Sequence, residues 1–328
     1  MDFVQGPKIG AAIPHQSAVT SLSYHEDGKH LYAATDDKRL YLIDAHDRRC
    51  NKPAYRCERV GISSVSSTHH DHCVLFTGTA RERRNIHYWS LYDNKMLRKF
   101  RGHTDDITNL SMSPSDDMFL TASKDRTVRL WNVQQAGGLA KMDAPAETEG
   151  TPHTVFDKTG MVFAVMAQMR GAQGNYIHLY DVRNFGGGAF SEMKVEASAV
   201  QQAMQTQRVT TNPSNQPITF KTMDFNMSGN RILIEADPGL TIVLDGYNGT
   251  VQRIFQSKEG NPTAACFTPD DQSVLIANDS AKVDCWNIQS GTVVKTLEGH
   301  MGPVGAVVCN PKYSQIASSC TNTCLWIW

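Results

Sequence analysis

The sequence predicts an all-β fold, a seven-bladed β-propeller formed by a single domain over residues 1–328. Two observations support this prediction. A short polar turn that follows an aromatic or apolar residue recurs with a period of 42 to 44 residues, which is typical of repeat architectures. The segments between these turns alternate apolar and polar residues, as half-buried strands do. Six of the turns begin at Tyr24, Met112, Phe156, Phe225, Phe267 and Cys309.

The spacing of the turns gives the number of blades. The interval of 88 residues between Tyr24 and Met112 equals two periods, so a seventh, degenerate turn is expected over Thr68–His72. The interval of 69 residues between Phe156 and Phe225 is one period of 44 with 25 residues inserted. Residues 196–217 account for this insertion and are rich in Gln, Asn and Pro. We expect them to form a polar surface loop between blades 4 and 5.

The third repeat shows the expected strands most clearly. Gly102-His103 opens it, and three short apolar segments follow at 107–112, 119–123 and 127–133. Short turns that contain Pro114 or Asp125 separate these segments. Strands of about five residues joined in this way form an antiparallel meander, which is the expected blade.

The two ends of the chain predict how the ring closes. The last repeat stops after its third strand, residues 324–328, so its blade lacks an outer strand. The segment 8–13 precedes the first repeat and has no partner there. We expect this N-terminal strand to close the last blade, because that arrangement removes an open sheet edge.

Bulk composition excludes several classes of protein. The formal net charge is −1, so overall charge predicts no nucleic-acid partner, and the eight cysteines lack metal-binding or redox spacing. We interpret them as small buried residues of a reducing compartment. The N-terminus has no basic start followed by an apolar run, and no stretch of 18 apolar residues occurs, so we expect a soluble intracellular protein without a membrane segment. The common phosphate-loop, dinucleotide and metalloprotease motifs do not occur, so neither catalysis nor a cofactor is expected.

The Gly-His, Asp-turn and Trp-Asn marks of the third repeat resemble those of the WD40 repeat. This resemblance implies a buried, hydrogen-bonded tetrad. Ser or Thr, His and Asp also make up a hydrolase triad, but here the hydroxyl lies in the middle of a strand, whereas a triad needs an exposed nucleophile. We therefore interpret the tetrad as structural. Its members would be His103, Thr121, Asp125 and Trp131.

Basic residues recur in the turn between the second and third strands of the first three repeats. In WD40 propellers these turns lie on one face, called the top. Basic side chains on adjacent turns of one face would bind a phosphate or an acidic peptide through charge-assisted hydrogen bonds. The alternative is a set of ordinary solvated turns. The candidate residues are Lys38, Arg39, Arg81, Arg83, Arg84, Lys124 and Arg126.

The run His69-His70-Asp71-His72 raises the question of a metal site. Histidines and carboxylates at this density bind zinc adventitiously. The turn belongs to the opposite face, however, and the sequence pattern places no further carboxylate or thiol pair beside it. We therefore predict that the protein holds no metal.

Four segments, 90–95, 110–117, 179–185 and 317–326, resemble the small seven-bladed WD-repeat subunit of COMPASS, the histone lysine methyltransferase complex. The resemblance implies a non-catalytic nuclear scaffold that binds the methyltransferase catalytic subunit and other COMPASS subunits. It also implies contact with the phosphorylated C-terminal repeat of RNA polymerase II during early transcription, with no sequence-specific nucleic acid and no membrane. Relatives also occur in a phosphatase complex and in RNA 3′-end processing. The alternatives are therefore an RNA 3′-end processing subunit or a general WD40 adaptor, such as a ubiquitin-ligase substrate receptor or a signalling scaffold.

Overall fold

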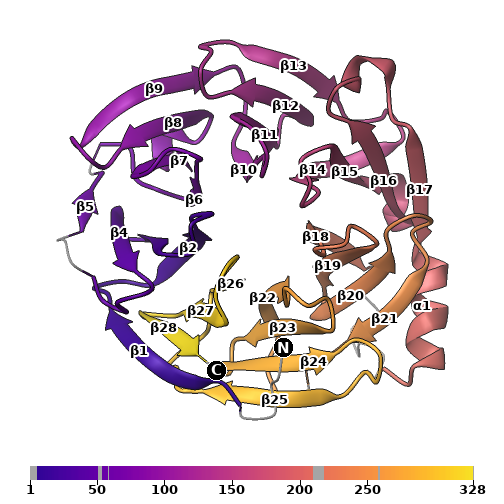
Figure 1. The fold of residues 1–328 in the computed structure, drawn as a ribbon. Helices are drawn as coiled ribbons and strands as arrows, with labels where there is room; N and C mark the ends of the chain where they lie inside the picture. Colours follow the sequence, from indigo (N-terminus) through magenta and orange to yellow (C-terminus); the bar gives the residue numbers. More distant parts are fainter. Residues whose placement is uncertain (1–5, 51–53, 58, 210–217, 258, 328) are drawn as a thin grey trace.

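The computed structural model describes residues 6–50, 54–57, 59–209, 218–257 and 259–327. Seven four-stranded antiparallel sheets surround a central axis, each with its first strand innermost (Figure 1). The seven-bladed β-propeller predicted from the sequence is thereby confirmed. The described residues contain one α-helix, and none of their helices has the length and apolar character needed to span a membrane.

The first three blades follow one another without long insertions. Blade 1 contains β2 (Val19–Tyr24), β3 (His30–Thr35), β4 (Arg39–Asp44) and β5 (Tyr55–Arg56). Blade 2 contains β6 (Ser64–Ser67), β7 (Cys73–Thr77), the short 3₁₀ helix η2 (Ala80–Glu82), β8 (Asn85–Ser90) and β9 (Lys95–Arg101). Blade 3 contains β10 (Ile107–Met112), β11 (Met118–Ser123), β12 (Thr127–Asn132) and β13 (Gly138–Asp143).

The remaining blades repeat the same order. Blade 4 contains β14 (Thr148–Phe156), β15 (Val162–Met169), η3 (Arg170–Ala172), β16 (Gly174–Asp181), η4 (Phe185–Gly187) and β17 (Ser191–Glu196). Blade 5 contains β18 (Thr219–Phe225), β19 (Arg231–Asp237), β20 (Leu240–Asp245) and β21 (Val251–Phe255). Blade 6 contains β22 (Pro262–Phe267), β23 (Ser273–Asn278), β24 (Lys282–Asn287) and β25 (Val293–Glu298). Blade 7 contains β26 (Ala306–Cys309), β27 (Gln315–Ser319), β28 (Asn322–Ile327) and the N-terminal strand β1 (Lys8–Pro14).

Strand β1 closes the ring, as predicted. It pairs antiparallel with β28, so that Lys8 lies opposite Ile327 and Ile13 opposite Thr323. In Figure 1 β1 lies along the outer side of β28 in this blade. The N-terminal strand thus supplies the outer strand that the last repeat lacks.

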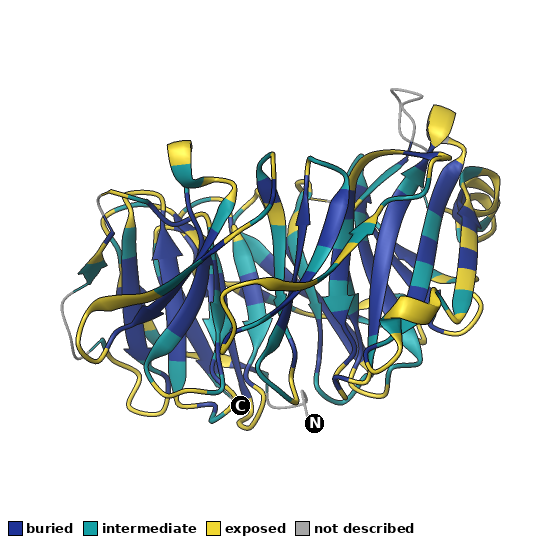
Figure 2. Ribbon diagram, turned by 90° about the horizontal axis from the view of Figure 1, so that it is seen from above, coloured by how far each residue is buried: buried dark blue, intermediate teal, exposed yellow. Residues whose placement is uncertain are grey.

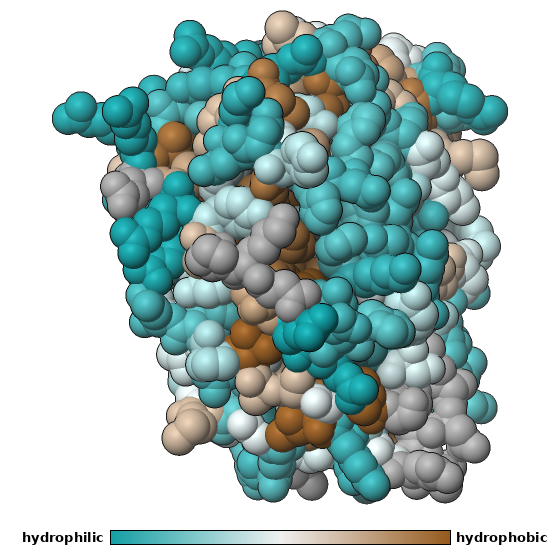
Figure 3. All heavy atoms as spheres, turned by 60° about the vertical axis from the view of Figure 1, so that its left-hand side comes forward, coloured by the Kyte–Doolittle hydropathy of each residue, from teal (hydrophilic) through white to brown (hydrophobic). Residues whose placement is uncertain are grey.

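The core lies between neighbouring blades. The second and third strands of each blade are buried on both sides because adjacent blades pack against them, whereas the outer strands are largely exposed (Figure 2). Between blades 2 and 3, for example, Phe100, Phe119 and Trp131 form one cluster of fully buried rings. The side formed by blades 1 and 2 is mostly hydrophilic, with apolar side chains exposed in separate patches (Figure 3).

The predicted polar surface loop over 196–217 differs from the structure in its first half. Helix α1 (Ala197–Thr206) occupies that part and packs against blades 4 and 5. Val200 and Met204, four residues apart, are buried on one face of the helix, and this helical spacing was obscured by the glutamines around it. Residues 210–217 lie outside the described part of the chain.

Two faces follow from this topology. The turns that join the second and third strands of each blade lie on one face, here called the top face. The turns that join the first and second strands lie on the opposite, bottom face. The degenerate turn predicted at 68–72 is present between β6 and β7 and belongs to the bottom face.

Candidate functional site

The structure brings His103, Thr121, Asp125 and Trp131 together in blade 3. His103 Nε2 lies 2.8 Å from Oγ1 of Thr121, and its Nδ1 lies 2.9 Å from Oδ2 of Asp125. Trp131 donates its Nε1–H to Thr121 Oγ1 at 2.8 Å. The Thr121 hydroxyl thus donates to the imidazole while it accepts from the indole. These hydrogen bonds connect β11 and β12 to the loop before β10.

This geometry supports a structural role for the four side chains. Thr121 and the side chain of His103 are fully buried, so the hydroxyl is not open to a substrate. Burial lowers the pKa of His103 and outweighs the opposing effect of Asp125, which keeps the imidazole neutral. Burial acts against ionisation of Asp125, but hydrogen bonds from the Thr127 hydroxyl, the Thr104 amide and His103 hold the pKa of its carboxyl well below the usual range.

A related arrangement occurs in blade 7. His300 Nε2 lies 2.6 Å from the Ser318 hydroxyl, and Trp326 donates to the same oxygen at 2.7 Å. Cys320 Sγ lies 3.2 Å from His300 Nδ1, the ring nitrogen that corresponds to the one contacted by Asp125 in blade 3. Burial lowers the pKa of His300 to about 4. The sequence carries a signal for this set, because Gly299-His300 and Trp326 repeat the marks of the third repeat.

All seven predicted basic residues lie on the top face of blades 1 to 3, but their surroundings differ. Lys38 and Arg39 lie where β3 turns into β4, three arginines lie in the β7–β8 connection, and Lys124 and Arg126 lie between β11 and β12. Main-chain hydrogen bonds connect two of these turns through Asp106 and Ile107. The Ile107 amide donates to the Arg83 carbonyl, and the Lys124 amide donates to the Asp106 carbonyl, both at 2.9 Å. The basic turns of blades 2 and 3 therefore lie beside each other on the top face.

Carboxylates lie among these basic side chains on the top face. Asp106 Oδ2 lies 3.6 Å from Nη1 of Arg83 and 3.3 Å from Nζ of Lys124, so it brings these two cations together. Asp37 pairs with Arg39 at 3.1 Å. Such partly exposed ion pairs contribute little to stability, so an incoming dianion can compete with the carboxylates.

Arg126 stands apart from the other six. Its Nη2 donates to the carbonyl oxygens of Pro145 and Thr148, at 3.2 and 2.8 Å. These bonds hold the connection between β13 and β14, so Arg126 serves the blade-to-blade junction. Lys38, Arg81 and Arg84, by contrast, are exposed and make no ion pair with a described residue. The cations open to a ligand are therefore Lys38, Arg81, Arg83, Arg84 and Lys124.

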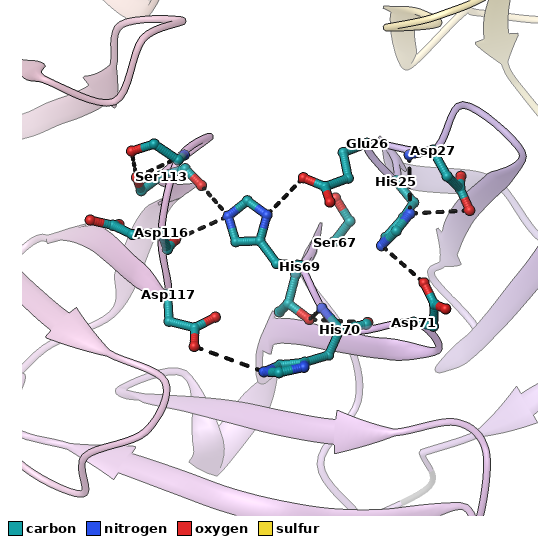
Figure 4. A network of polar contacts seen from close by, with 12 residues as sticks. His25, Glu26, Asp27, Ser67, His69, His70, Asp71, Ser113, Asp116 and Asp117 are labelled. Atoms are coloured by element: carbon teal, nitrogen blue, oxygen red, sulfur yellow. Dashed lines mark hydrogen bonds and ion pairs between the residues drawn. The ribbon is translucent and has the colours of Figure 1, made fainter.

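The bottom face carries a polar network that joins blades 1, 2 and 3 (Figure 4). His69 Nδ1 lies 2.7 Å from Oε2 of Glu26, and its Nε2 lies 3.1 and 3.0 Å from the carbonyl oxygens of Ser113 and Asp116. Both ring nitrogens thus face acceptors, an arrangement that suits the imidazolium. Burial works against the charge, but the hydrogen bond and charge of Glu26 and the two carbonyls raise the pKa of His69.

A cavity of about 540 Å³ lies at the centre of the ring, lined mainly by the innermost strands and bottom-face turns of blades 1 to 4, with Asp224 of blade 5 and Pro311 of blade 7. Its wall carries several small hydroxyl side chains, among them Ser21, Ser23, Ser66 and Ser111. Several of these hydroxyls bond across blades, as from Ser67 to the carbonyl of Tyr24 at 2.8 Å. These hydrogen bonds between innermost strands therefore help to hold neighbouring blades in register.

The fold and these sites define a class. Seven four-stranded blades make a β-propeller, and the imidazole–hydroxyl–indole network in two of the blades resembles that of WD40 repeats. The family model described as "WD domain, G-beta repeat" matches residues 9–44, 94–132 and 291–328. Each match covers the outer strand of one blade (β1, β9 or β25) and the first three strands of the next, which is blade 1, 3 or 7. The chain is a seven-bladed β-propeller, and three of its segments match the WD40 repeat.

Similarity to particular proteins extends over most of the chain. It is 28% identical to "WD repeat-containing protein 82" of Drosophila melanogaster, over 94% of this chain and 90% of that protein. It is 25% identical to "COMPASS component SWD2" of Saccharomyces cerevisiae, over 92% of this chain and 88% of that protein. It is also 25% identical to "Set1 complex component swd2" of Schizosaccharomyces pombe, over 80% and 69%. The resemblance to the small WD-repeat subunit of COMPASS is thereby confirmed.

Proposed function

We propose that this protein is a non-catalytic nuclear scaffold subunit of a COMPASS-type histone lysine methyltransferase complex. The observation that carries the proposal is the similarity to the yeast COMPASS component SWD2, which spans 92% of the chain and therefore all seven blades. In this role the propeller binds the methyltransferase catalytic subunit and other COMPASS subunits. The buried position of Thr121 supports a scaffold over an enzyme, because the hydroxyl–imidazole–carboxylate set lies inside a blade.

The top face of blades 1 to 3 supports a second part of the proposal, which is that the scaffold docks the phosphorylated C-terminal repeat of RNA polymerase II. A phosphoserine carries nearly two negative charges and three strong acceptor oxygens, which arginine side chains recognise well. Arg83 and Lys124 already converge on the carboxylate of Asp106, so their geometry suits an oxyanion. Lys38, Arg81 and Arg84 add three exposed cations on the same face.

Affinity purification tests the complex. The full chain, tagged and expressed in its own cells, should recover a histone lysine methyltransferase catalytic subunit and should localise to the nucleus. Recovery of ubiquitin-ligase subunits or RNA 3′-end processing factors without the methyltransferase would contradict the proposal and support one of the alternative scaffolds.

Peptide titration tests the docking surface. Fluorescence anisotropy should show tighter binding of a polymerase repeat peptide when its serines are phosphorylated. The charge reversal of Arg83 and Lys124 to Glu should weaken that binding at least about tenfold, since charge-assisted contacts are lost. The matched control reverses Lys141 and Arg183, which are exposed and lie outside the top-face turns of blades 1 to 3. Equal affinity for both peptides, or an equal loss in the control, would refute docking at this face.

A further inference from the structure

The turn between β2 and β3, on the bottom face of blade 1, gathers three side chains with metal-binding atoms. His25, Asp27 and His30 each offer one such atom, and these atoms all lie within 4.8 Å of one another. Two imidazoles and a carboxylate are a ligand set that suits Zn²⁺. This site lies on the face opposite the proposed docking surface.

The carboxylate of Asp27 is held in a fixed orientation. Its Oδ1 accepts hydrogen bonds from the amides of Lys29 and His30, at 2.7 and 3.1 Å. This leaves Oδ2 directed at the imidazoles, 2.6 Å from His30 Nδ1 and 3.2 Å from His25 Nδ1. Hydrogen bonds of this kind orient ligands in metal sites.

His25 Nδ1 faces Asp27 as an unprotonated nitrogen. It accepts a hydrogen bond from the Asp27 amide at 3.2 Å, so its single lone pair is directed at this residue, and a bound metal would replace that hydrogen bond. Asp27 Oδ2 also presents lone pairs, and it lies 3.2 Å from the same nitrogen. Two acceptors at this distance repel each other unless a cation lies between them. The His25 side chain is only 3% exposed, so water does little to screen that repulsion.

The next blade supplies further ligands. The ring of His72, in the β6–β7 turn, meets the ring of His30 edge-on, with the centroids 5.0 Å apart. Asp71 Oδ1 lies 3.8 Å from His25 Nε2, a buried nitrogen without a hydrogen-bond partner among the described residues (Figure 4). The sequence predicts no metal at 69–72 because no partner for that turn is evident along the chain. The structure places the blade 1 turn directly beside it.

We propose that His25, Asp27 and His30 bind a divalent transition metal of Zn²⁺ type, with His72 of blade 2 as the fourth ligand. Bonds of about 2.0–2.1 Å in a tetrahedral site separate the ligand atoms by roughly 3.3 Å. The 3.2 Å between His25 and Asp27 meets this requirement as it stands. His30 must move outward by a fraction of an ångström, and its side chain, 25% exposed, has room to do so. The metal would fasten the bottom-face turns of blades 1 and 2 to each other.

Zinc titration of the full chain tests the proposal. Protein without a histidine tag, stripped of metal with a chelator, is titrated with ZnCl₂ in a calorimeter near neutral pH. The expected result is one tight site per chain and a rise in melting temperature with Zn²⁺. His30→Ala should weaken binding roughly 100-fold and abolish the rise, and His72→Ala should weaken binding about tenfold.

The matched control is His46→Ala. His46 is 67% exposed in another turn of blade 1 and also pairs with an aspartate, Asp47, at 3.3 Å, but it lies outside the cluster. This variant should bind Zn²⁺ like the unchanged protein. Circular dichroism without metal establishes that each variant folds, and His72→Ala tests the site without altering the blade 1 turn. Absence of a stoichiometric site, or unchanged affinity in both His30→Ala and His72→Ala, would overturn the proposal and identify any binding as adventitious.

Discussion

His69 Nδ1 lies 2.7 Å from Oε2 of Glu26, and the two residues belong to equivalent turns of neighbouring blades. The pair shows how the bottom-face turns of this propeller hold one another. Between blades 5 and 6 a different pair has the same function, since Asp271 accepts hydrogen bonds from the amides of Met227 and Ser228. The repeated turn therefore acts as an interblade connector whose chemistry varies from one junction to the next.

The Glu26–His69 pair should make stability depend on pH. The pKa of His69 is raised in the folded protein, so the stabilisation is complete below the unfolded value of about 6.5 and is lost as pH rises through the folded value. Glu26→Gln should therefore lower the melting temperature more at about pH 6 than at about pH 8.5. The effect should not exceed about 1 kcal/mol, because Glu26 is more than half exposed.

The control for this prediction is Glu149→Gln, which removes the same charge from an exposed position without an ion pair to a described residue. Its effect on melting should not change between the two pH values. If Glu26→Gln lowers the melting temperature equally at both pH values, or more at the higher pH, the pH dependence of stability does not come from this pair.

His103→Ala should destabilise the protein by about 2–4 kcal/mol in denaturant unfolding, because the change leaves Thr121 and Asp125 buried without one partner each. The loss is limited because Asp125 keeps its bonds from Thr104 and Thr127. His46→Ala, at an exposed site, should remain within about 0.5 kcal/mol of the unchanged protein. An unfolding midpoint for His103→Ala equal to that of His46→Ala would exclude a stabilising role for the tetrad.

The blades and the ring closure are predictable from the sequence because they depend on local patterns. In the sequence, a strand shows as alternating apolar and polar residues, and a blade shows as the regular spacing of the turns. Strand β1 shows as an apolar segment that has no partner in its own repeat. The interblade contacts are less visible because each joins two turns, yet the period carries a signal for them. His69 is 43 residues from Glu26 and 47 from Asp116, so residues one period apart meet at a junction.

Side chains of the candidate site were less predictable because their role depends on what surrounds them. The sequence places Lys124 and Arg126 in one turn and gives both the same charge. Only the fold shows that Lys124 faces Asp106 whereas Arg126 turns to carbonyl oxygens. Helix α1 was missed for another reason, since polar composition hid the spacing of Val200 and Met204.

Arg126→Ala should lower stability by about 1.5–3 kcal/mol, because it removes a charged donor from two partly buried carbonyls of the β13–β14 connection. Lys124→Ala, two residues away and exposed, should change stability by less than about 0.5 kcal/mol. Chemical denaturation of the two variants makes the comparison. Equal effects would mean that the Arg126 bonds to Pro145 and Thr148 contribute nothing to the junction.

The last prediction concerns the N-terminal strand. Ile13 is 8% exposed and packs in the cluster that includes Leu325 and Leu31, between blades 7 and 1, whereas Ile9 on the same strand is 45% exposed. Ile13→Ala should therefore lower the free energy of unfolding by about 2–4 kcal/mol and Ile9→Ala by less than about 1 kcal/mol. Removal of residues 1–14 should have a larger effect, because it also leaves the edge of β28 without its hydrogen-bonding partner. Thermal and denaturant unfolding measure all three variants, and a truncated chain as stable as Ile9→Ala would show that the ring does not depend on this closure.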